Sequence, residues 1–399
     1  MSRTWTCAFL LLLCVPACSS DPDEGAPPGS PTDDPNTIAY SVETQVASGA
    51  EVQLCKFITM PTDRGDLAVN RVNHSYTEGS HHFLVFRTAM TEMPPGGEDL
   101  VPCDQTEWMS SVRGVAYGAQ TTDGDNTMPE GVSQRFTAGE ILLVQTHYVN
   151  ATAQALDARI DFAFHTVPAE QAPIEAGLLF FFNPVINVPP NGSASAELSC
   201  PVPADVNLLF ASSHMHKRGV GFEAQQEGGA RGSLYTTDRW SDPIPRSFSG
   251  EPEATIAAGS AITYRCDFQN DRAETVMVGT RADEDEMCMF TGMYYPRLDD
   301  DTERCMHGAA VTKGTRSCFD AIGCARDCAE SDTTCRAGCI EQVCPTAAVP
   351  MMQFLQCFGP ACSETCRAGG TESPECSECV TSKCLTQAAA CNAATCAAP

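Results

Sequence analysis

Short apolar segments separated by turn residues run through residues 37–305. They are rich in Val, Ile, Phe and Leu, and Gly, Pro, Asn and Asp interrupt them, as at Pro94-Pro95-Gly96-Gly97. This pattern is typical of β-strands, and a helical period over ten or more residues is hard to find. The clearest predicted strands are His81–Arg87, Glu140–Val149, Ala158–Thr166, Leu178–Asn183, Leu208–Ser213 and Ala261–Phe268. The pattern predicts an all-β fold.

The length of this region favours two domains. Residues 37–305 exceed the usual size of one antiparallel sandwich and suit two. The prolines at 168 and 173 offer a seam between them. We therefore expect tandem antiparallel β-sandwich, jelly-roll-like domains over 37–168 and 169–305.

Residues 306–399, which follow the predicted β region, form a cysteine-rich repeat. Two cysteines with three residues between them lie on one face of a helix. Each unit is therefore expected to be a small disulfide-stapled helical hairpin. A zinc site is the alternative for clustered cysteines. The two copies are Cys318, Cys324, Cys328, Cys335, Cys339 and Cys344, then Cys357, Cys362, Cys366, Cys376, Cys379 and Cys384, and Cys391 with Cys396 resembles the start of a third.

The N-terminus predicts export. Arg3 precedes a short apolar run that is too short to span a bilayer and has the layout of a secretory signal, residues 1–17. The segment Val15-Pro16-Ala17-Cys18 resembles a bacterial lipobox, which would leave Cys18 acylated. Residues 18–36 have the composition of a disordered tether. The alternative is an ordinary signal peptide, but either reading places the protein outside the cytosol of a bacterium, in the periplasm or at the cell surface.

Composition agrees with an exported protein. The chain has 23 cysteines, and twenty remain after Cys7, Cys14 and Cys18 are set aside, an even number that suits complete disulfide pairing outside the cytosol. The formal net charge of -27 disfavours a nucleic-acid partner, because phosphate binding needs positive charge.

Five of the eight histidines occur in arrangements that can gather imidazoles. His214 and His216 are two apart, which puts both rings on one face of a strand. His81 and His82 are adjacent, so they can share a metal only where the strand is irregular, as at a β-bulge. His147 follows the apolar strand at 141–144. Each signal alone is weak, and the prediction of a metal site depends on the set.

These motifs resemble those of the copper type II, ascorbate-dependent monooxygenases, a family that includes peptidylglycine alpha-hydroxylating and dopamine beta-monooxygenases. The resemblance covers about residues 40–305. It rests on Ser80-His81-His82-Phe83-Leu84-Val85-Phe86, Gln145-Thr146-His147-Tyr148, His214-Met215-His216-Lys217-Arg218-Gly219 and Asp285-Glu286-Met287-Cys288.

The resemblance implies two copper ions per chain. His81, His82 and His147 would hold the electron-transfer copper, and the catalytic residues His214, His216 and Met287 would hold the copper that meets dioxygen. A thioether suits Cu(I), whereas a three-histidine zinc site, the rival reading, would not explain Met287. A reductant such as ascorbate would load both ions, and the second electron would cross solvent between the domains. The family also implies the disulfides Cys55–Cys103, Cys200–Cys305 and Cys266–Cys288.

The sequence departs from the peptide-processing relatives around the substrate. Ser212 stands where those enzymes have an arginine that grips the substrate carboxylate, and no other cation replaces it. Tyr294 and Tyr295 are candidate pocket residues or simply strand residues. Lys217 and Arg218 are near the motif but are equally suited to a solvated rim. We expect a small, partly apolar substrate of unidentified structure.

Three functions remain open at this point. The first is a copper monooxygenase that hydroxylates a C–H bond with dioxygen. The second is a copper-binding surface lipoprotein without turnover. The third is an adhesion or interaction protein that uses the cysteine-rich tail to bind an unknown partner.

Overall fold

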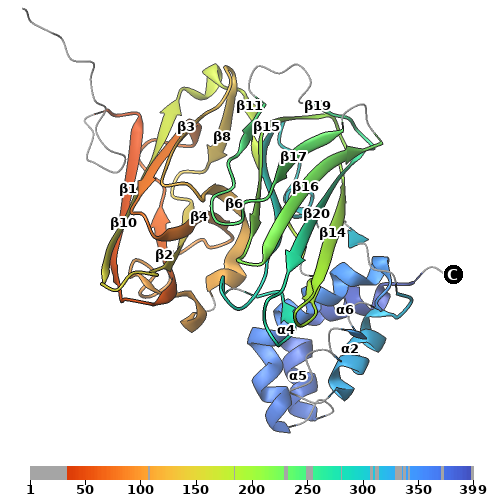
Figure 1. Ribbon diagram of the computed structural model, residues 1–399. Coiled ribbons are helices and arrows are strands. Elements are labelled where there is room, and N and C mark those ends of the chain that lie inside the picture. Colours follow the sequence, from red (N-terminus) through yellow and green to blue (C-terminus); the bar gives the residue numbers. More distant parts are fainter. Residues whose placement is uncertain are drawn as a thin grey trace, which may run out of the picture.

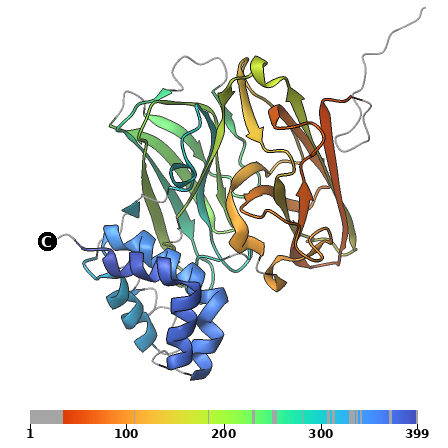
Figure 2. The same cartoon turned by 180° about the vertical axis from the view of Figure 1, so that it is seen from behind.

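The computed structural model describes residues 34–396, apart from 107, 184, 229–231, 249–254, 280, 306–308, 311–313, 329–334, 336–337, 340–341 and 370–372. Within these residues, two β-sandwiches lie side by side, and a group of helices lies at one end of the second sandwich (Figures 1 and 2). The prediction of an all-β fold with a disulfide-rich helical tail is confirmed. The expected signal peptide, Cys18 and most of the tether lie outside the described residues.

The first sandwich contains two sheets. One has the order β1-β10-β3-β8-β11 with β7 paired to β3, and the other has the order β5-β2-β9-β4-β6. Only the β8–β11 pair among these described ladders is parallel. The strands are β1 Thr37–Val46, β2 Glu51–Thr59, β3 Leu67–Tyr76, β4 Ser80–Thr88, β5 Val101–Pro102, β6 Val112–Ala119, β7 Asp123–Thr127, β8 Val132–Phe136, β9 Ile141–Val149, β10 Leu156–Val167 and β11 Ile174–Glu175, with 3-10 turns at η1 Cys103–Gln105, η2 Trp108–Ser111 and η3 Ala169–Gln171.

The second sandwich begins at β12. Its two main sheets have the orders β12-β22-β15-β18, with β19 paired to β15, and β17-β16-β20-β14-β23, while β13 and β21 form a separate pair. The strands are β12 Gly177–Phe182, β13 Asn187–Val188, β14 Ser193–Pro201, β15 Val206–Met215, β16 Gly219–Glu227, β17 Ser233–Thr237, β18 Arg246–Ser247, β19 Thr255–Ile256, β20 Ala261–Gln269, β21 Val276–Met277, β22 Cys288–Tyr295 and β23 Ala309–Ala310. A short helix, α1 Asp300–Arg304, follows β22.

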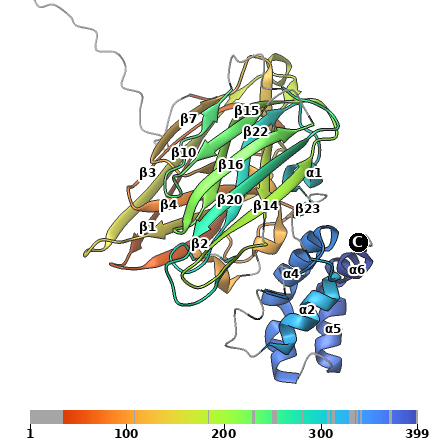
Figure 3. The ribbon, with the colours of Figure 1, turned by 45° about the vertical axis from the view of Figure 1, so that its right-hand side comes forward.

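The two sandwiches are joined by an apolar interface. The strand β9 is buried on both faces, because Leu142 and Val144 point into the core of the first sandwich while Ile141 and Leu143 point toward the second. Leu209 of β15 meets them from the other side. In Figure 3 the second sandwich, with β14, β16 and β20, lies in front of the first, and the inner sheets of the two sandwiches pack directly against each other. The ends of these two inner sheets carry the histidines described below.

All twenty cysteines from Cys55 to Cys396 are paired in disulfides. The sandwiches contain the three pairs that the family resemblance implies, Cys55–Cys103, Cys200–Cys305 and Cys266–Cys288. The tail holds seven more, so its cysteines are disulfide partners and not zinc ligands. This number of disulfides indicates an exported protein.

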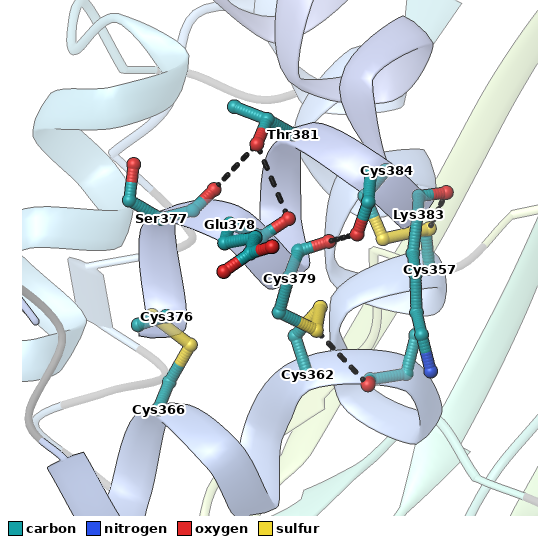
Figure 4. Close-up of a disulfide and its surroundings, with 12 residues drawn as sticks. Cys357, Cys362, Cys366, Cys376, Ser377, Glu378, Cys379, Thr381, Lys383 and Cys384 are labelled. Atoms are coloured by element: carbon teal, nitrogen blue, oxygen red, sulfur yellow. Dashed lines mark hydrogen bonds between the residues drawn. A yellow bond between two sulfur atoms is a disulfide. The ribbon is translucent and has the colours of Figure 1, made fainter. Parts of the chain in front are cut away.

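The helices whose bounds are described in the tail are α2 Cys318–Asp327, α4 Pro345–Gly369, α5 Pro374–Lys383 and α6 Leu385–Ala393. Nested bridges staple α4 to α5, as Figure 4 shows for Cys357–Cys384, Cys362–Cys379 and Cys366–Cys376. No helix among the described residues is both long and apolar enough to cross a membrane.

One prediction about the repeat is wrong. Cys391 and Cys396 do not open a third copy but bond back to Cys318 and Cys344 of the first. The first unit keeps two bridges of its own, Cys324–Cys339 and Cys328–Cys335. The first and last cysteines of this unit therefore form disulfides with Cys391 and Cys396.

Candidate metal centre

The structure brings the five predicted histidines of both sandwiches into one cluster. His81 and His82 begin β4 and His147 lies near the end of β9, whereas His214 lies in β15 and His216 directly follows it. All five side chains are buried, none more than 7% exposed. The imidazole ring centroids of neighbouring members lie 4.9 to 5.9 Å apart, across the boundary between the sandwiches as well as within each.

The adjacent pair is positioned by an irregularity in β4. The pairing of β4 with β9 shifts register between Ser80 and His82, so that His82 lies directly opposite His147 and His81 occupies the extra position. A bulge of this kind changes the alternation of side chains and turns two consecutive residues toward one side. The backbone irregularity predicted from the sequence is confirmed.

The segment that carries His214 and His216 is positioned by the buried carboxylate of Glu286. The backbone N–H groups of His216 and Arg218 donate hydrogen bonds to Glu286, at 3.0 and 2.6 Å. Burial raises the pKa of Glu286 to about 7, although these hydrogen bonds act in the opposite direction. Glu286 thus holds the turn after β15 in the shape that directs His216 back toward His214.

Met287 directly follows Glu286 in the chain and directly precedes β22. Strands β15 and β22 pair His214 with Met289 and Met215 with Cys288. The ladder ends at this pair, and the next residue along each strand end is His216 on one side and Met287 on the other. The Cys266–Cys288 disulfide ties the neighbouring residue to β20 and fixes where the segment runs.

Three outer contacts orient the imidazole rings. Nε2 of His147 lies 2.8 Å from Oε1 of Glu51, and the same oxygen accepts a hydrogen bond from the backbone N–H of Ala282 in the second sandwich. Nδ1 of His214 lies 2.5 Å from Oε1 of Gln120, whose amide donates to the carbonyl of Ser213. Nδ1 of His216 lies 3.2 Å from the carbonyl oxygen of Asp285.

Sequence reasoning missed Glu51, Gln120 and Glu286 as parts of this site. Glu51 and Gln120 reach the histidines only because β-pairing and the interface between the sandwiches bring distant segments together. Trp240, whose ring lies 5.9 Å from that of His81, was missed for the same reason. Glu286 had one available signal, its position beside Met287 in the quoted motif.

The electrostatics of the cluster keep the imidazoles of His81, His82, His214 and His216 neutral. Burial, followed by the neighbouring rings, lowers the pKa of His81 to about 3. Burial likewise lowers the pKa of His216 to about 4, and the pKa values of His82 and His214 fall well below the usual range for the same two reasons. A neutral imidazole has a free lone pair on one nitrogen, which is the form that binds metal.

Each of the five rings also has one buried nitrogen without a hydrogen-bond partner. These atoms are Nε2 of His81, Nδ1 of His82, Nδ1 of His147, Nε2 of His214 and Nε2 of His216. A buried polar atom left unsatisfied costs about 1–3 kcal/mol, so five in one place indicate a ligand that satisfies them together. The nitrogens of His81, His82 and His214 all lie within 4.8 Å of one another. Imidazole donors of this kind fit copper, zinc, iron or nickel.

The remaining predicted site residues occupy different places. Ser212 is buried two residues before His214 on β15, so it faces the same side of the strand. Tyr294 lies in the core of the second sandwich, where its hydroxyl contacts Glu303 and accepts a hydrogen bond from the backbone of Leu298. Tyr295 packs against the apolar interface between the sandwiches.

The two basic residues after His216 differ in exposure. Lys217 is exposed. The side chain of Arg218 is only 6% exposed, and its Nε lies 3.2 Å from a carboxylate oxygen of Asp271. Arg218 is therefore a buried, ion-paired residue, and of its two readings the solvated rim charge does not hold.

Residues 174–316 match the family model described as "Copper type II ascorbate-dependent monooxygenase, C-terminal domain". This part of the chain, which contains His214, His216 and Met287, is similar to the C-terminal domain of that family.

Other comparisons report only distant likeness. Among solved structures, the major capsid protein P2 of bacteriophage PM2 aligns with a TM-score of 0.26 and 11% identity, covering 64% of this chain and 97% of that one. PNGase F, a glycosylasparaginase from Flavobacterium meningosepticum, aligns with a TM-score of 0.28 and 11% identity, covering 65% and 95%. A search of curated protein sequences finds no match.

One expectation drawn from the family resemblance is contradicted. Two histidine sets separated by solvent were expected, but rings from the two sets lie as close as 4.9 Å, between His82 and His214. The sheets that carry them pack through an apolar cluster that includes Leu143 and Leu209. The interface between the sandwiches therefore leaves the two sets in contact.

Proposed function

We propose that the protein is a copper-dependent monooxygenase that hydroxylates a C–H bond of a small organic substrate with dioxygen and a reductant such as ascorbate. The observation that carries this proposal is the set of five buried imidazole nitrogens without partners, two of them within the segment that matches the family. Copper held there would supply one-electron chemistry with dioxygen, and Met287 is the proposed thioether ligand for its reduced state.

The chain's own residues prepare the site in three ways. Burial keeps the imidazoles of His81 and His216 neutral, so their lone pairs are available at neutral pH. Glu51 and Gln120 fix the orientation of His147 and His214 through their second ring nitrogens. Outer contacts of this kind orient ligands and raise their basicity. Glu286 fixes the turn that directs His216 into the cluster.

The surroundings favour a substrate without a carboxylate handle. Ser212, a short neutral side chain, faces the same side of β15 as His214 and cannot form the bidentate pair that an arginine makes with a carboxylate. The indole of Trp240 lies beside His81 and offers an aromatic surface. We propose a small, partly apolar substrate, with Ser212 and Trp240 near its binding place.

The test is oxygen consumption with product analysis. Copper-loaded protein with ascorbate is offered a panel of benzylic compounds and amines, and hydroxylated products are measured by mass spectrometry. The proposal expects one product per oxygen consumed, and loss of at least about tenfold in turnover for His216→Ala. His165→Ala is the matched control, because that ring lies outside the cluster and contacts Thr37 and Asn73.

The outcomes separate the candidate functions. Copper bound without substrate-dependent oxygen consumption or product would identify a copper-binding protein without turnover. Fewer than about one copper per chain after loading would contradict both copper functions.

We also propose that Cys18 anchors the exported protein to a membrane through acyl chains. Two or more chains on one residue hold a protein firmly at a bilayer. Cys18→Ala should release the protein from the membrane fraction into the soluble fraction, as immunoblotting would show. An unchanged membrane fraction would contradict the anchor.

A further inference from the structure

We infer that the five histidines form one shared centre, in which His81 and His82 of the first sandwich and His214 of the second contribute to the same ion. Metal binding would then bridge the two sandwiches. This inference rests on the proposed copper function but does not follow from it, because the family resemblance implies two sets of ligands that act apart.

The nitrogen distances are the first argument. In a site with metal–nitrogen bonds of about 2.0 Å, two nitrogens on one ion lie at most about 4 Å apart. The nitrogens of His81, His82 and His214 all lie within 4.8 Å of one another. A change of less than about 1 Å therefore closes this trio around an ion, which is within the range of side-chain adjustment on binding.

The membership of the trio is the second argument. It combines residues of β4 with a residue of β15, although His147 is directly opposite His82 in the same sheet. The ring centroid of His82 is 4.9 Å from that of His214 and 5.0 Å from that of His147, so neither sandwich has a stronger claim on it.

The third argument is that hydrogen bonds between the two sandwiches hold the histidine rings in this arrangement. Gln120 of the first sandwich contacts the ring of His214 and the backbone of Ser213 in the second. Glu51 contacts His147 and the backbone of Ala282. The apolar cluster that includes Leu143 and Leu209 joins the same two sheets. These contacts fix the rings of opposite sandwiches next to each other before any ion arrives.

A shared centre changes what each ligand controls. In separate sites, removing His214 would affect only the ion held by the second sandwich. In a shared centre, removing it also weakens the ion bound at His81 and His82, because that ion loses one of its donors. The affinity of each sandwich's histidines for copper then depends on the other sandwich.

The experiment is a copper titration of the purified full-length protein and of His214→Ala. Copper content is measured by elemental analysis, affinity by competition with a chromogenic chelator, and the Cu(II) environment by electron paramagnetic resonance. His214→Gln is the second variant. Its polar side chain fits this buried position better than alanine, so it serves if His214→Ala does not fold. His165→Ala is the control for loss of a histidine elsewhere.

The expected result is that no ion in either His214 variant keeps its wild-type affinity and spectrum, and that the weakening is at least about tenfold. If two ions bind to the wild type, their Cu(II) spins should also couple, so that the integrated signal accounts for fewer spins than copper atoms.

An ion that remains in both variants with unchanged affinity and spectrum would overturn the shared centre while leaving the copper function intact. Absence of copper binding in the wild type would instead overturn the proposed function itself.

Discussion

Replacing Glu51 by alanine should weaken copper binding without removing any proposed ligand. One oxygen of this carboxylate lies 2.8 Å from Nε2 of His147 and accepts a hydrogen bond, also 2.8 Å long, from the backbone N–H of Ala282. The two contacts hold the pKa of Glu51 at about 2, against the opposing effect of burial. Glu51 therefore fixes both the ring of His147, a proposed ligand, and the segment that leads to Glu286.

The magnitude follows from these contacts. Loss of an outer partner of a metal-bound histidine costs about 10- to 100-fold in metal affinity, which is about 1.4–2.7 kcal/mol. Ala282 is buried, so its N–H loses an acceptor and the metal-free protein should lose about 1–3 kcal/mol of stability. Glu51→Gln should fall between alanine and wild type, because its amide oxygen still accepts hydrogen bonds but carries no charge.

The assay is chelator competition for copper, with thermal unfolding of the metal-free protein measured alongside. Glu43→Ala is the control, because Glu43 is an exposed residue of the first sandwich whose partner is Arg159. An affinity for Glu51→Ala within twofold of wild type, or an equal loss in Glu43→Ala, would show that the outer contact does not orient the ligand.

Three further predictions address other parts of the molecule. Met287→Ala should abolish turnover while copper content stays at the wild-type level; retained turnover, measured as oxygen consumption, would contradict the thioether assignment. Replacing Cys266 and Cys288 together by alanine should lower the free energy of unfolding by roughly 3 kcal/mol, because the bridge closes a loop of 22 residues; a loss under about 1 kcal/mol in chemical denaturation would contradict this. Glu140→Ala should cost about 3–5 kcal/mol at neutral pH, since it leaves Arg87 buried without its partner. Although burial opposes it, Arg87 lowers the pKa of Glu140 below 4.5, so this carboxylate stabilises the fold above pH 4.5 and less as the pH falls further; a cost that does not shrink in acid would contradict the ion pair.

The elements of the fold were predictable where a strand has a regular pattern of its own. Segments such as Leu208–Ser213 alternate or run apolar between turn residues, and they are strands in the structure. The bulge at His81 was also predictable, because two adjacent histidines cannot share a metal on a regular strand.

The arrangement of the sandwiches was not predictable in the same way. The burial of β9 on both faces is visible in the run Ile141–Val144, but a sequence does not tell which second sheet covers the outer face. The separated histidine sets were carried over from the family resemblance, whereas the structure places His82 beside His214. Long-range partners such as Glu51 and Gln120 depend on this same interface.

The pairing in the tail shows a different limit. Cysteine spacing predicted hairpins, and α4 with α5 is one. Spacing alone does not fix connectivity, because several pairings satisfy the same intervals. The cysteines at 391 and 396 could therefore be read as a new repeat, although they close the first one.

The bridges Cys318–Cys391 and Cys344–Cys396 have a consequence for proteolysis. A protease that cuts the backbone once anywhere between Cys318 and Cys391 leaves two fragments that stay covalently joined. The nested bridges between α4 and α5 add a second set of links within that interval. An exported protein meets proteases that an intracellular one does not, and this tail can be nicked without being shed. A single cut removes the whole tail only in the short stretch between Cys305 and Cys318.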